Sequence, residues 1–383
     1  MKLKDCFNID DFRRLAKRRL PSPIFNFIDG GAEDEVTLRR NTEAFNQVDL
    51  IPHTLAGMET VDMSTTVLGQ QLKTPLFFSP VAIQRLFHQD GELAAARVAA
   101  KYGTLFGVST MSTTSLEDIA AATQGPKLFQ LYMHRDQGLN RDLVSRCKEA
   151  GYQALALTVD TVVSGNRERD RRTGMTTPPK LTLKSLLSFA LHPEWTISYF
   201  LGTRFELANV AAYVNQGSDI ASSVQDYINN QMHSNISWAD AESVRKDWDG
   251  PFAIKGILSV EDAKRAVDIG ATAIILSNHG GRQLDAARTP FEALTEIVDG
   301  VGDRIEVILD GGIKRGSHVL KALALGARAC SGGRFYIFPL AAGGERGIEQ
   351  AMDLIYNEIY RDMMLMGCKS IKDLDRSRIA SRL

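Results

Sequence analysis

The sequence contains little cysteine, and its cysteines and histidines have no spacing that is typical of a metal site. Its 383 residues include four cysteines, and no two of them form a C-x-x-C pair. This excludes a small disulfide scaffold and argues against a zinc ribbon. Among the seven histidines, no two have H-x-x-x-H spacing. We therefore expect free thiols in a reducing cytosol and no bound metal.

Long apolar runs and an excess of charge of either sign are also absent. No stretch approaches the roughly 20 apolar residues that cross a bilayer, and charges interrupt residues 1–14, so no secretory signal is expected. The 45 basic and 46 acidic residues give a net charge of −1, which provides no bulk attraction to nucleic acid. Glu168 and Asp170 dilute the one basic stretch, at 167–172. We expect a cytoplasmic protein without a nucleic-acid partner.

Short apolar runs alternate with amphipathic segments from residue 75 onward. The runs are continuous, as expected of strands buried on both faces, and they cover residues 75–79, 105–110, 128–133, 154–160, 252–256, 273–278, 306–310 and 328–332. Eight such strands with helices between them predict a (β/α)8 TIM barrel within a single domain, residues 1–383. Seven or nine strands would fit an open doubly wound sheet about as well.

An amphipathic helix is expected before the barrel. Asn8 is suited to cap it and Pro21 to end it. The apolar residues between them form one stripe: Ile9, Phe12, Leu15 and Ala16.

The gap between the fourth and fifth predicted strands is too long for one crossover. We expect an insertion there over residues 175–237, with apolar segments on either side of Pro193. Because proline interrupts a helix, the insertion cannot form one membrane-spanning helix. It is predicted to be a lid, an oligomer contact or an interfacial segment that docks on a membrane.

In a barrel, functional side chains gather where the strands end at their carboxyl termini. The residues at those positions are Pro80, Val81, Ala82, Ser109, Gln130, Tyr132, Thr158, Asp160, Arg167, Lys255, Ser277, His279, Arg282, Asp310, Gly311, Gly312, Gly333 and Arg334. They form the candidate site.

The last two strands are followed by glycine pairs, which suit a phosphate site. Gly311–Gly312 and Gly332–Gly333 let backbone N–H groups approach phosphate oxygens, and barrels often bind phosphate there. Arg334 and either Lys314 or Arg315 would supply positive charge. The alternative is that these glycines only form tight turns.

Lys255 lies inside an apolar strand and therefore needs a partner. It could form a salt bridge within the barrel, face an anionic cofactor or intermediate, or form a Schiff base. The residue pattern alone leaves all three open.

His279 is the candidate general base, since it follows the sixth predicted strand. Arg282 could clamp a carboxylate with two hydrogen bonds, and Asp160 could pair with His279 and raise its proton affinity.

Five motifs resemble one known family. They are GGAEDE at 30–35, FQLY at 129–132, TVD at 158–160, SNHGGRQLD at 277–285 and LDGG at 309–312. Over residues 7–361 the chain resembles the FMN-dependent L-2-hydroxy acid oxidases and dehydrogenases, which include lactate oxidase, glycolate oxidase, lactate dehydrogenase and mandelate dehydrogenase. The resemblance implies an FMN cofactor, oxidation of an L-2-hydroxy acid to the 2-keto acid, reoxidation by quinone or oxygen, and a homotetramer.

The resemblance also implies a role for each site residue. His279 would be the base with Asp160 as its partner, and Arg282, Arg167 and Tyr132 would contact the substrate. Lys255 would lie at the N1/C2-carbonyl edge of the flavin. The remaining cofactor contacts would come from Pro80, Val81, Ala82, Ser109, Gln130, Thr158 and Ser277 at the ring, Asp310 at the ribityl chain, and Gly311, Gly312, Lys314, Gly333 and Arg334 around the phosphate.

Some features bear on the substrate and on the electron acceptor. Phe27 stands where the family usually has a tyrosine that hydrogen-bonds the substrate carboxylate, which favours a more apolar substrate. Ala82 resembles the lactate- and glycolate-using members and argues for a small one. The HPEW segment at 192–195 resembles the membrane-associated, quinone-linked members, which favours a dehydrogenase that is peripheral on the inner membrane face.

Two other classes remain open at this point. One is a barrel enzyme of the aldolase type that uses Lys255 covalently. The other is a flavin-binding homologue without catalysis.

Overall fold

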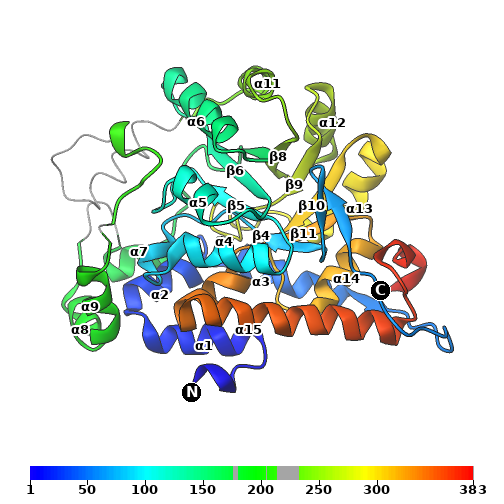
Figure 1. Cartoon of the computed structure of the whole chain (residues 1–383), viewed down its shortest axis with the longest axis horizontal. Helices are drawn as coiled ribbons and strands as arrows, with labels where there is room; N and C mark the ends of the chain where they lie inside the picture. The colour runs from blue at the N-terminus through cyan, green and yellow to red at the C-terminus, as the bar shows by residue number, and fades with distance from the viewer. Residues whose placement is uncertain (176–179, 204, 214–232, 383) are drawn as a thin grey trace.

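The computed structural model describes residues 1–175, 180–203, 205–213 and 233–382. Its centre is a closed parallel barrel in the order β10-β11-β4-β5-β6-β7-β8-β9 (Figure 1). The strands are β4 (Leu76–Phe78), β5 (Phe106–Ser109), β6 (Lys127–Tyr132), β7 (Ala154–Thr158), β8 (Phe252–Ile257), β9 (Ala273–Leu276), β10 (Glu306–Asp310) and β11 (Ala329–Gly332). Each falls on a predicted apolar run, so the (β/α)8 prediction is confirmed.

Helices surround the barrel, and most begin at a side chain that caps their first N–H groups. Asp136, Ser237, Ser259 and Thr289 each accept from backbone N–H groups of the next turn. The helices are α4 (Gly91–Lys101), α5 (Leu116–Ala122), α6 (Gln137–Glu149), α11 (Trp238–Asp247), α12 (Val260–Asp268), α13 (Pro290–Val301), α14 (Gly316–Ala324) and α15 (Arg334–Met366).

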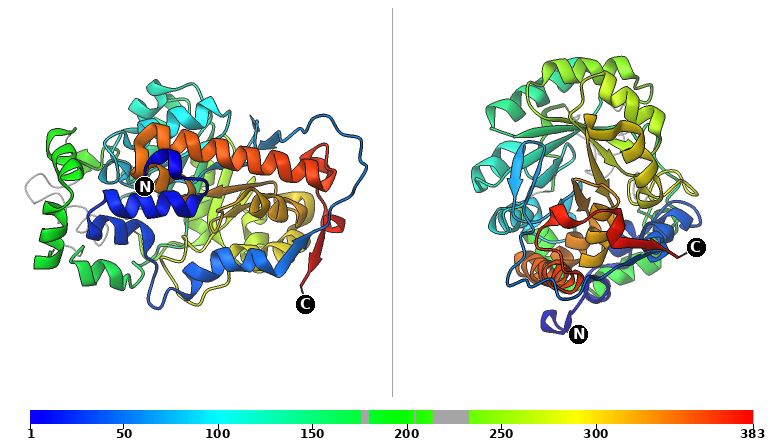
Figure 2. Two further views of the ribbon diagram at one scale, coloured as in Figure 1. Left: turned by 90° about the horizontal axis from the view of Figure 1, so that it is seen from below. Right: turned by 90° about the vertical axis from the view of Figure 1, so that its right-hand side faces the viewer.

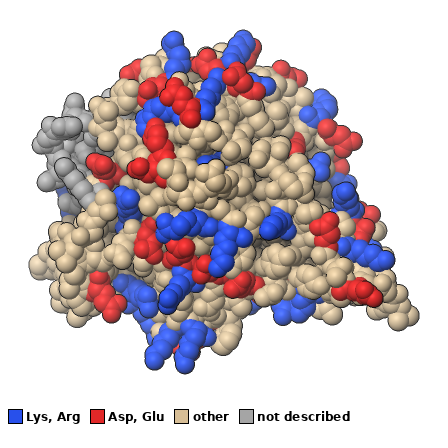
Figure 3. All heavy atoms as spheres, viewed as in Figure 1, with Lys and Arg blue, Asp and Glu red and all other residues tan. Residues whose placement is uncertain are grey.

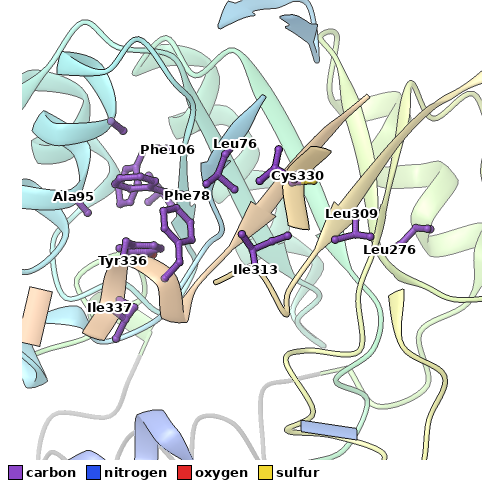
Figure 4. Close-up of a cluster of buried hydrophobic side chains, with 14 of the residues drawn as sticks. Leu76, Phe78, Ala95, Phe106, Leu276, Leu309, Ile313, Cys330, Tyr336 and Ile337 are labelled. Atoms are coloured by element: carbon purple, nitrogen blue, oxygen red, sulfur yellow. The ribbon is translucent and has the colours of Figure 1, made fainter. Parts of the chain in front are cut away.

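Apolar side chains fill both the inside of the barrel and the layer between strands and helices. The inside is narrow and rich in alanine, and the hairpin of β2 (Thr65–Val67) and β3 (Gln70–Leu72) packs into it. In the outer layer the ring of Phe78 on β4 stacks on Tyr336 of α15, with centroids 4.6 Å apart (Figure 4). Buried this way on both faces, the strands hold their carboxyl ends in fixed positions.

The N-terminal segment covers the barrel from outside. Helix α1 (Ile9–Arg19) begins at Asn8, whose side chain accepts from the Asp11 N–H at 2.9 Å, and ends just before Pro21. Its predicted apolar stripe is buried, and α1 runs beside α15 (Figure 2). Helices α2 (Ser22–Asp29) and α3 (Val36–Glu43) follow. Strand β1 (Val48–Leu50) pairs antiparallel with β12 (Ile379–Ser381) and so connects the segment after α3 to the C-terminal segment.

The long connection after β7 contains α7 (Glu168–Thr173), α8 (Leu183–Ala190) and α9 (Pro193–Leu201), which project from one end of the molecule (Figures 1 and 2). Pro193 is the first residue of α9, so the predicted interruption is confirmed. Within the predicted insertion, 176–179, 204 and 214–232 lie outside the described residues. In the described part of the chain, no helix is both long and apolar enough to cross a membrane.

Charges are mixed over the face drawn in Figure 3, and few lie over the α8–α9 end.

The short 3-10 helices are η1 (Leu3–Asp5), η2 (Ala44–Gln47), η3 (Gln84–Leu86), η4 (Ala211–Tyr213), η5 (Gly302–Arg304), η6 (Ile371–Asp373) and η7 (Arg376–Arg378).

Candidate active site

A cavity of about 1630 Å³ opens where the barrel strands end at their carboxyl termini. Residues of the strand ends line it together with α1, α2, α3 and the helices of the insertion. Pockets for one drug-sized ligand usually measure about 300–1,000 Å³, so this one has room for two molecules side by side.

His279 lies at this cavity and contacts Asp160 through one ring nitrogen. Its Nδ1 is 2.9 Å from Asp160 Oδ1, and its backbone N–H donates to Ser277 Oγ at 3.0 Å. With Asp160 as the acceptor, Nδ1 carries the proton and Nε2 is free to accept one. The backbone of His279 has a φ of +57°, a strained conformation that often occurs at functional sites.

Tyr132 lies on the other side of the same ring. Its hydroxyl is 3.4 Å from His279 Nε2. Burial and the charge of Asp160 raise the pKa of Tyr132 to about 12. The hydroxyl is therefore protonated at neutral pH and can donate a hydrogen bond to a ligand beside Nε2.

The loop that carries His279 is fixed by the N-terminal helices. Asn278 and Asn41 of α3 exchange two amide hydrogen bonds, of 2.7 and 2.8 Å. A Cβ on Gly281 would lie 2.5 Å from the Leu38 backbone nitrogen, so only glycine fits there. Asp285 caps α3 by accepting from Thr37 N–H at 2.8 Å. Ala32 of the GGAEDE motif also donates its N–H to the Gly281 carbonyl at 2.8 Å, so both motifs hold this loop in place. Asn41 could not be identified from the sequence, because a single asparagine in a polar helix carries no signal.

Two arginines and Phe27 lie together at the cavity wall. The Cζ atoms of Arg282 and Arg167 are 4.9 and 6.0 Å from the centroid of the Phe27 ring. Arg282 donates to the carbonyls of Phe27 and Gly30, the second at 3.1 Å. Neither arginine forms an ion pair with a carboxylate within the described residues.

Burial lowers the pKa of both arginines, and the neighbouring cations lower that of Arg282 further. The pKa of Asp170, a buried carboxylate at the same cavity, is raised by burial. Crowded positive charge out of water favours a bound anion. This corner can therefore hold a carboxylate.

Lys255 is buried on β8 and pairs with Asp310 on β10. Its Nζ lies 2.8 Å from Asp310 Oδ2 and 2.8 Å from Ser277 Oγ. Burial by itself would lower the pKa of Lys255, but the charges of Asp310 and Asp160 raise it above the usual value. The amine is therefore a cation, which suits the stabilisation of negative charge and not a Schiff base.

Asp310 is surrounded by donors. Besides Lys255, it accepts from the hydroxyls of Ser277 at 2.8 Å, Ser331 at 2.9 Å and Ser79. The carboxylate is buried, and Lys255 and the hydroxyls hold its pKa below the usual value. Ser79 and Ser331 could not be identified from the sequence, because each is a single hydroxyl at the end of a strand.

Two buried polar atoms beside the Lys255 end of the barrel have no hydrogen-bond partner within the described residues. They are Gln130 Nε2 and Thr158 Oγ1, and Gln130 Oε1 already accepts from Ser109 at 3.1 Å. An unmade buried hydrogen bond costs about 1–3 kcal/mol, so a ligand with matching polar atoms gains from binding here. Pro80, Val81 and Ala82 line the adjoining cavity wall. These groups fit a flat heterocycle such as a flavin ring.

The two glycine loops also border the cavity, and their glycines differ in the space around them. A Cβ on Gly312 would lie 2.0 Å from the Asn41 carbonyl oxygen, so this glycine is required for packing. Gly311, with a φ of +98°, has open space around it. Gly333 directly precedes α15, so the positive end of that helix faces the cavity.

The cations predicted near a phosphate have protein partners. Arg334 donates at 2.8 Å to the carbonyls of Ile28, Gly30 and Gly280, and burial lowers its pKa to about 10. Lys314 pairs with Asp10 at 2.9 Å and lines the cavity. Arg315, the alternative to Lys314, pairs instead with Glu358 on α15 at 2.7 Å.

Known proteins are similar over the whole chain. Residues 16–381 match the family model described as FMN-dependent dehydrogenase. An L-lactate oxidase of Nostoc sp. is 41% identical and an L-lactate dehydrogenase of Caulobacter vibrioides is 40% identical, each over 97% of both chains. A crystal structure of the monotopic membrane protein (S)-mandelate dehydrogenase superposes with a TM-score of 0.94 at 35% identity, over 99% of this chain and 100% of that one.

Proposed function

The chain belongs to the FMN-dependent dehydrogenases, and within that family we propose that it oxidises an L-2-hydroxy acid to the 2-keto acid with His279 as the base. The observation that carries this proposal is one cavity in which a histidine–aspartate pair faces an arginine pair. A 2-hydroxy acid has a carboxylate next to a carbon that loses hydrogen, and the two pairs match those two parts.

FMN has a place in this cavity. Gln130, Thr158 and Ser109 would contact the ring, with Ser277 and Lys255 along one edge and the backbone of residues 80–82 along the other side. Asp310 would bind the ribityl chain. The phosphate would lie near the positive end of α15, against Gly311, Gly312, Gly333, Lys314 and Arg334. Bound FMN supplies a two-electron acceptor.

The protein groups would act as follows. Arg167 and Arg282 bind the substrate carboxylate and thereby orient the hydroxyl toward His279 Nε2. Tyr132 donates a hydrogen bond beside it. His279 takes the proton as the substrate is oxidised, and Asp160 stabilises the imidazolium that forms. Lys255 offers a fixed positive charge near the electron acceptor.

The other two classes have less support. A Schiff-base enzyme needs a neutral lysine, whereas Lys255 is paired with Asp310 at 2.8 Å. A flavin-binding protein without catalysis would have no use for the His279–Asp160 contact of 2.9 Å.

The test is an anaerobic absorbance spectrum of the purified protein before and after addition of L-lactate and then L-mandelate. We expect a flavin spectrum that bleaches with at least one acid. A protein that takes up no FMN, or a flavin that no 2-hydroxy acid bleaches, would contradict the proposal. Air and then a soluble quinone, added to the reduced protein, separate oxidase from dehydrogenase.

We further propose a quinone as acceptor and a peripheral membrane contact through α8 and α9. Large apolar side chains are exposed on these helices: Leu183, Leu186, Leu187, Leu191, Ile197, Phe200 and Leu201. Such a face on short helices suits the membrane interface. The similar mandelate dehydrogenase is titled a monotopic membrane protein. The alternatives are that this face belongs to a lid or to an oligomer contact. The homotetramer stays a prediction.

A further inference from the structure

The proposed binding of FMN and of the reacting groups leaves one part of the large cavity without an assigned ligand group. The carboxylate, the hydroxyl and the α-hydrogen of a 2-hydroxy acid are accounted for by Arg167, Arg282, Tyr132 and His279. The fourth substituent of the α-carbon, the side chain of the acid, must then lie elsewhere in the cavity. The cavity reaches from these residues to the helices of the insertion, since Phe189, Trp195, Tyr199 and Phe205 line it as well.

Aromatic side chains line the cavity from the arginine corner to the insertion. The ring of Phe27, which lies against Arg282, is 6.3 Å from that of Phe87. The neighbouring residue, Leu86, accepts a hydrogen bond of 2.9 Å through its carbonyl from Trp195 Nε1.

Beyond Trp195 the rings continue along α9. Trp195 stacks on Tyr199 with centroids 5.0 Å apart and an angle of 11°, and Tyr199 lies 6.2 Å from Phe205. The indole N–H is already bonded, so Trp195 lines the cavity as an aromatic ring without a free donor.

We infer that Phe27, Phe87, Trp195 and Tyr199 form an apolar arm of the cavity that binds a long aliphatic or aromatic side chain of the 2-hydroxy acid. The arm starts at Phe27, directly beside the arginines that would hold the carboxylate. An apolar group joined to the carboxylate-bearing carbon is the ligand that can occupy both places at once. Phe27 also offers no hydroxyl for a small polar substrate. This inference rests on the proposed function and specifies its substrate.

The first test is a series of L-2-hydroxy acids in anaerobic single-turnover reduction of the bound flavin. The series runs from lactate through 2-hydroxybutanoate and 2-hydroxyhexanoate to 2-hydroxyoctanoate, with phenyllactate added. We expect the second-order rate constant to rise about fourfold for each methylene buried in the arm. Equal constants for lactate and 2-hydroxyoctanoate would overturn the inference and leave the proposed function standing. Reduction by none of the acids would overturn both.

Truncation of the arm's side chains tests whether these residues bind the side chain of the acid. Tyr199→Ala and Trp195→Ala should each remove most of the gain with chain length and leave the constant for lactate unchanged. No residue of α9 is fully buried, so these changes alter the cavity more than the fold. Trp238→Phe, on α11 and away from the cavity lining, is the matched control and should behave as the unchanged protein. If the α9 variants lowered the second-order rate constant equally for all acids, the assignment of Trp195 and Tyr199 to the arm would be contradicted.

A second readout does not depend on turnover. Octanoate, which cannot be oxidised at the α-carbon in this way, should change the tryptophan fluorescence of the FMN-loaded protein, whereas acetate should not. The change should disappear in Trp195→Phe and remain in Trp238→Phe. Two results together would assign the arm to the electron acceptor and overturn the inference: displacement of octanoate by a soluble short-chain quinone, and the same second-order rate constant for every acid of the series.

Discussion

At the scale of single residues, the imidazole of His279 has a defined direction. Asp160 holds Nδ1 of His279 at 2.9 Å, which leaves Nε2 toward Tyr132 and the cavity. A second carboxylate oxygen, Asp160 Oδ2, is buried without a partner within the described residues. This oxygen can therefore accept a further hydrogen bond.

Asp160→Asn should slow flavin reduction by about 10²–10⁴-fold, because the amide neither fixes the tautomer nor stabilises the imidazolium. FMN should remain bound, since Asp160 is not among the proposed cofactor contacts. Anaerobic stopped-flow absorbance measures the rate, and the flavin-to-protein ratio is the control. A reduction rate within twofold of the original would rule out the role given to Asp160.

Phe27→Tyr should lower the Michaelis constant for lactate by about tenfold, since the added hydroxyl can donate to the carboxylate between Arg167 and Arg282. The Michaelis constant for 2-hydroxyoctanoate should change less than that for lactate. Steady-state kinetics with both acids provides the comparison. An unchanged Michaelis constant for lactate would mean that Phe27 does not face the carboxylate.

At the scale of elements, α8 turns different residues toward the cavity and toward solvent. Leu186 and Phe189 line the cavity, whereas Leu187 and Leu191 are not in its lining and are 59% and 69% exposed. The helix can therefore contact a membrane and the site at once.

Leu187→Glu should weaken binding to anionic phospholipid vesicles by tenfold or more, because burial of a leucine contributes about 1.5–3 kcal/mol. Flavin reduction in solution should not change. Leu365→Glu on α15, where the leucine is 67% exposed, is the matched control and should bind vesicles normally. Vesicle flotation is the measurement. Equal flotation of both variants would exclude α8 from the contact.

Helix α14 contains a buried histidine that should make stability depend on pH. The ring of His318 stacks on Phe45 with centroids 4.4 Å apart, and burial lowers its pKa to about 4. Unfolded histidine has a pKa of roughly 6.5, so between pH 6.5 and 4 the unfolded chain binds more protons. The free energy of unfolding should therefore fall as the pH is lowered through this window, by roughly 3 kcal/mol for this residue.

The check is the urea midpoint at several pH values between 7 and 4 for the unchanged protein and His318→Gln. The variant should show a shallower pH dependence, whatever its stability at pH 7. His134, whose pKa burial also lowers to about 4, should account for part of what remains. The same slope in both proteins would show that His318 does not titrate as described.

At the scale of the whole molecule, the barrel could be predicted because its strands are buried on both faces. Continuous apolar runs are the direct result of that burial, and all eight lie where the sequence analysis expected them. The fold then brings the carboxyl ends of the strands together, which is why Lys255 and Asp310 meet although they are 55 positions apart in the sequence.

Contacts that depend on packing between distant segments could not be predicted. The amide exchange of Asn41 with Asn278 and the hydroxyls around Asp310 involve common polar residues without a pattern. Trp195 of α9 donates to the carbonyl of Leu86 in η3, although the two segments are far apart in the sequence. The resemblance to a family gave the roles, while the distances required the structure.

We propose that His279 is the base in oxidation of a 2-hydroxy acid, and the site depends on this residue more than on any other. Anaerobic stopped-flow reduction of the FMN-loaded protein, with and without His279→Ala, tests it most directly. We predict that the variant retains flavin and that its reduction by the best acid of the series falls by at least about 10²-fold. Equal reduction rates in the two proteins would contradict the account.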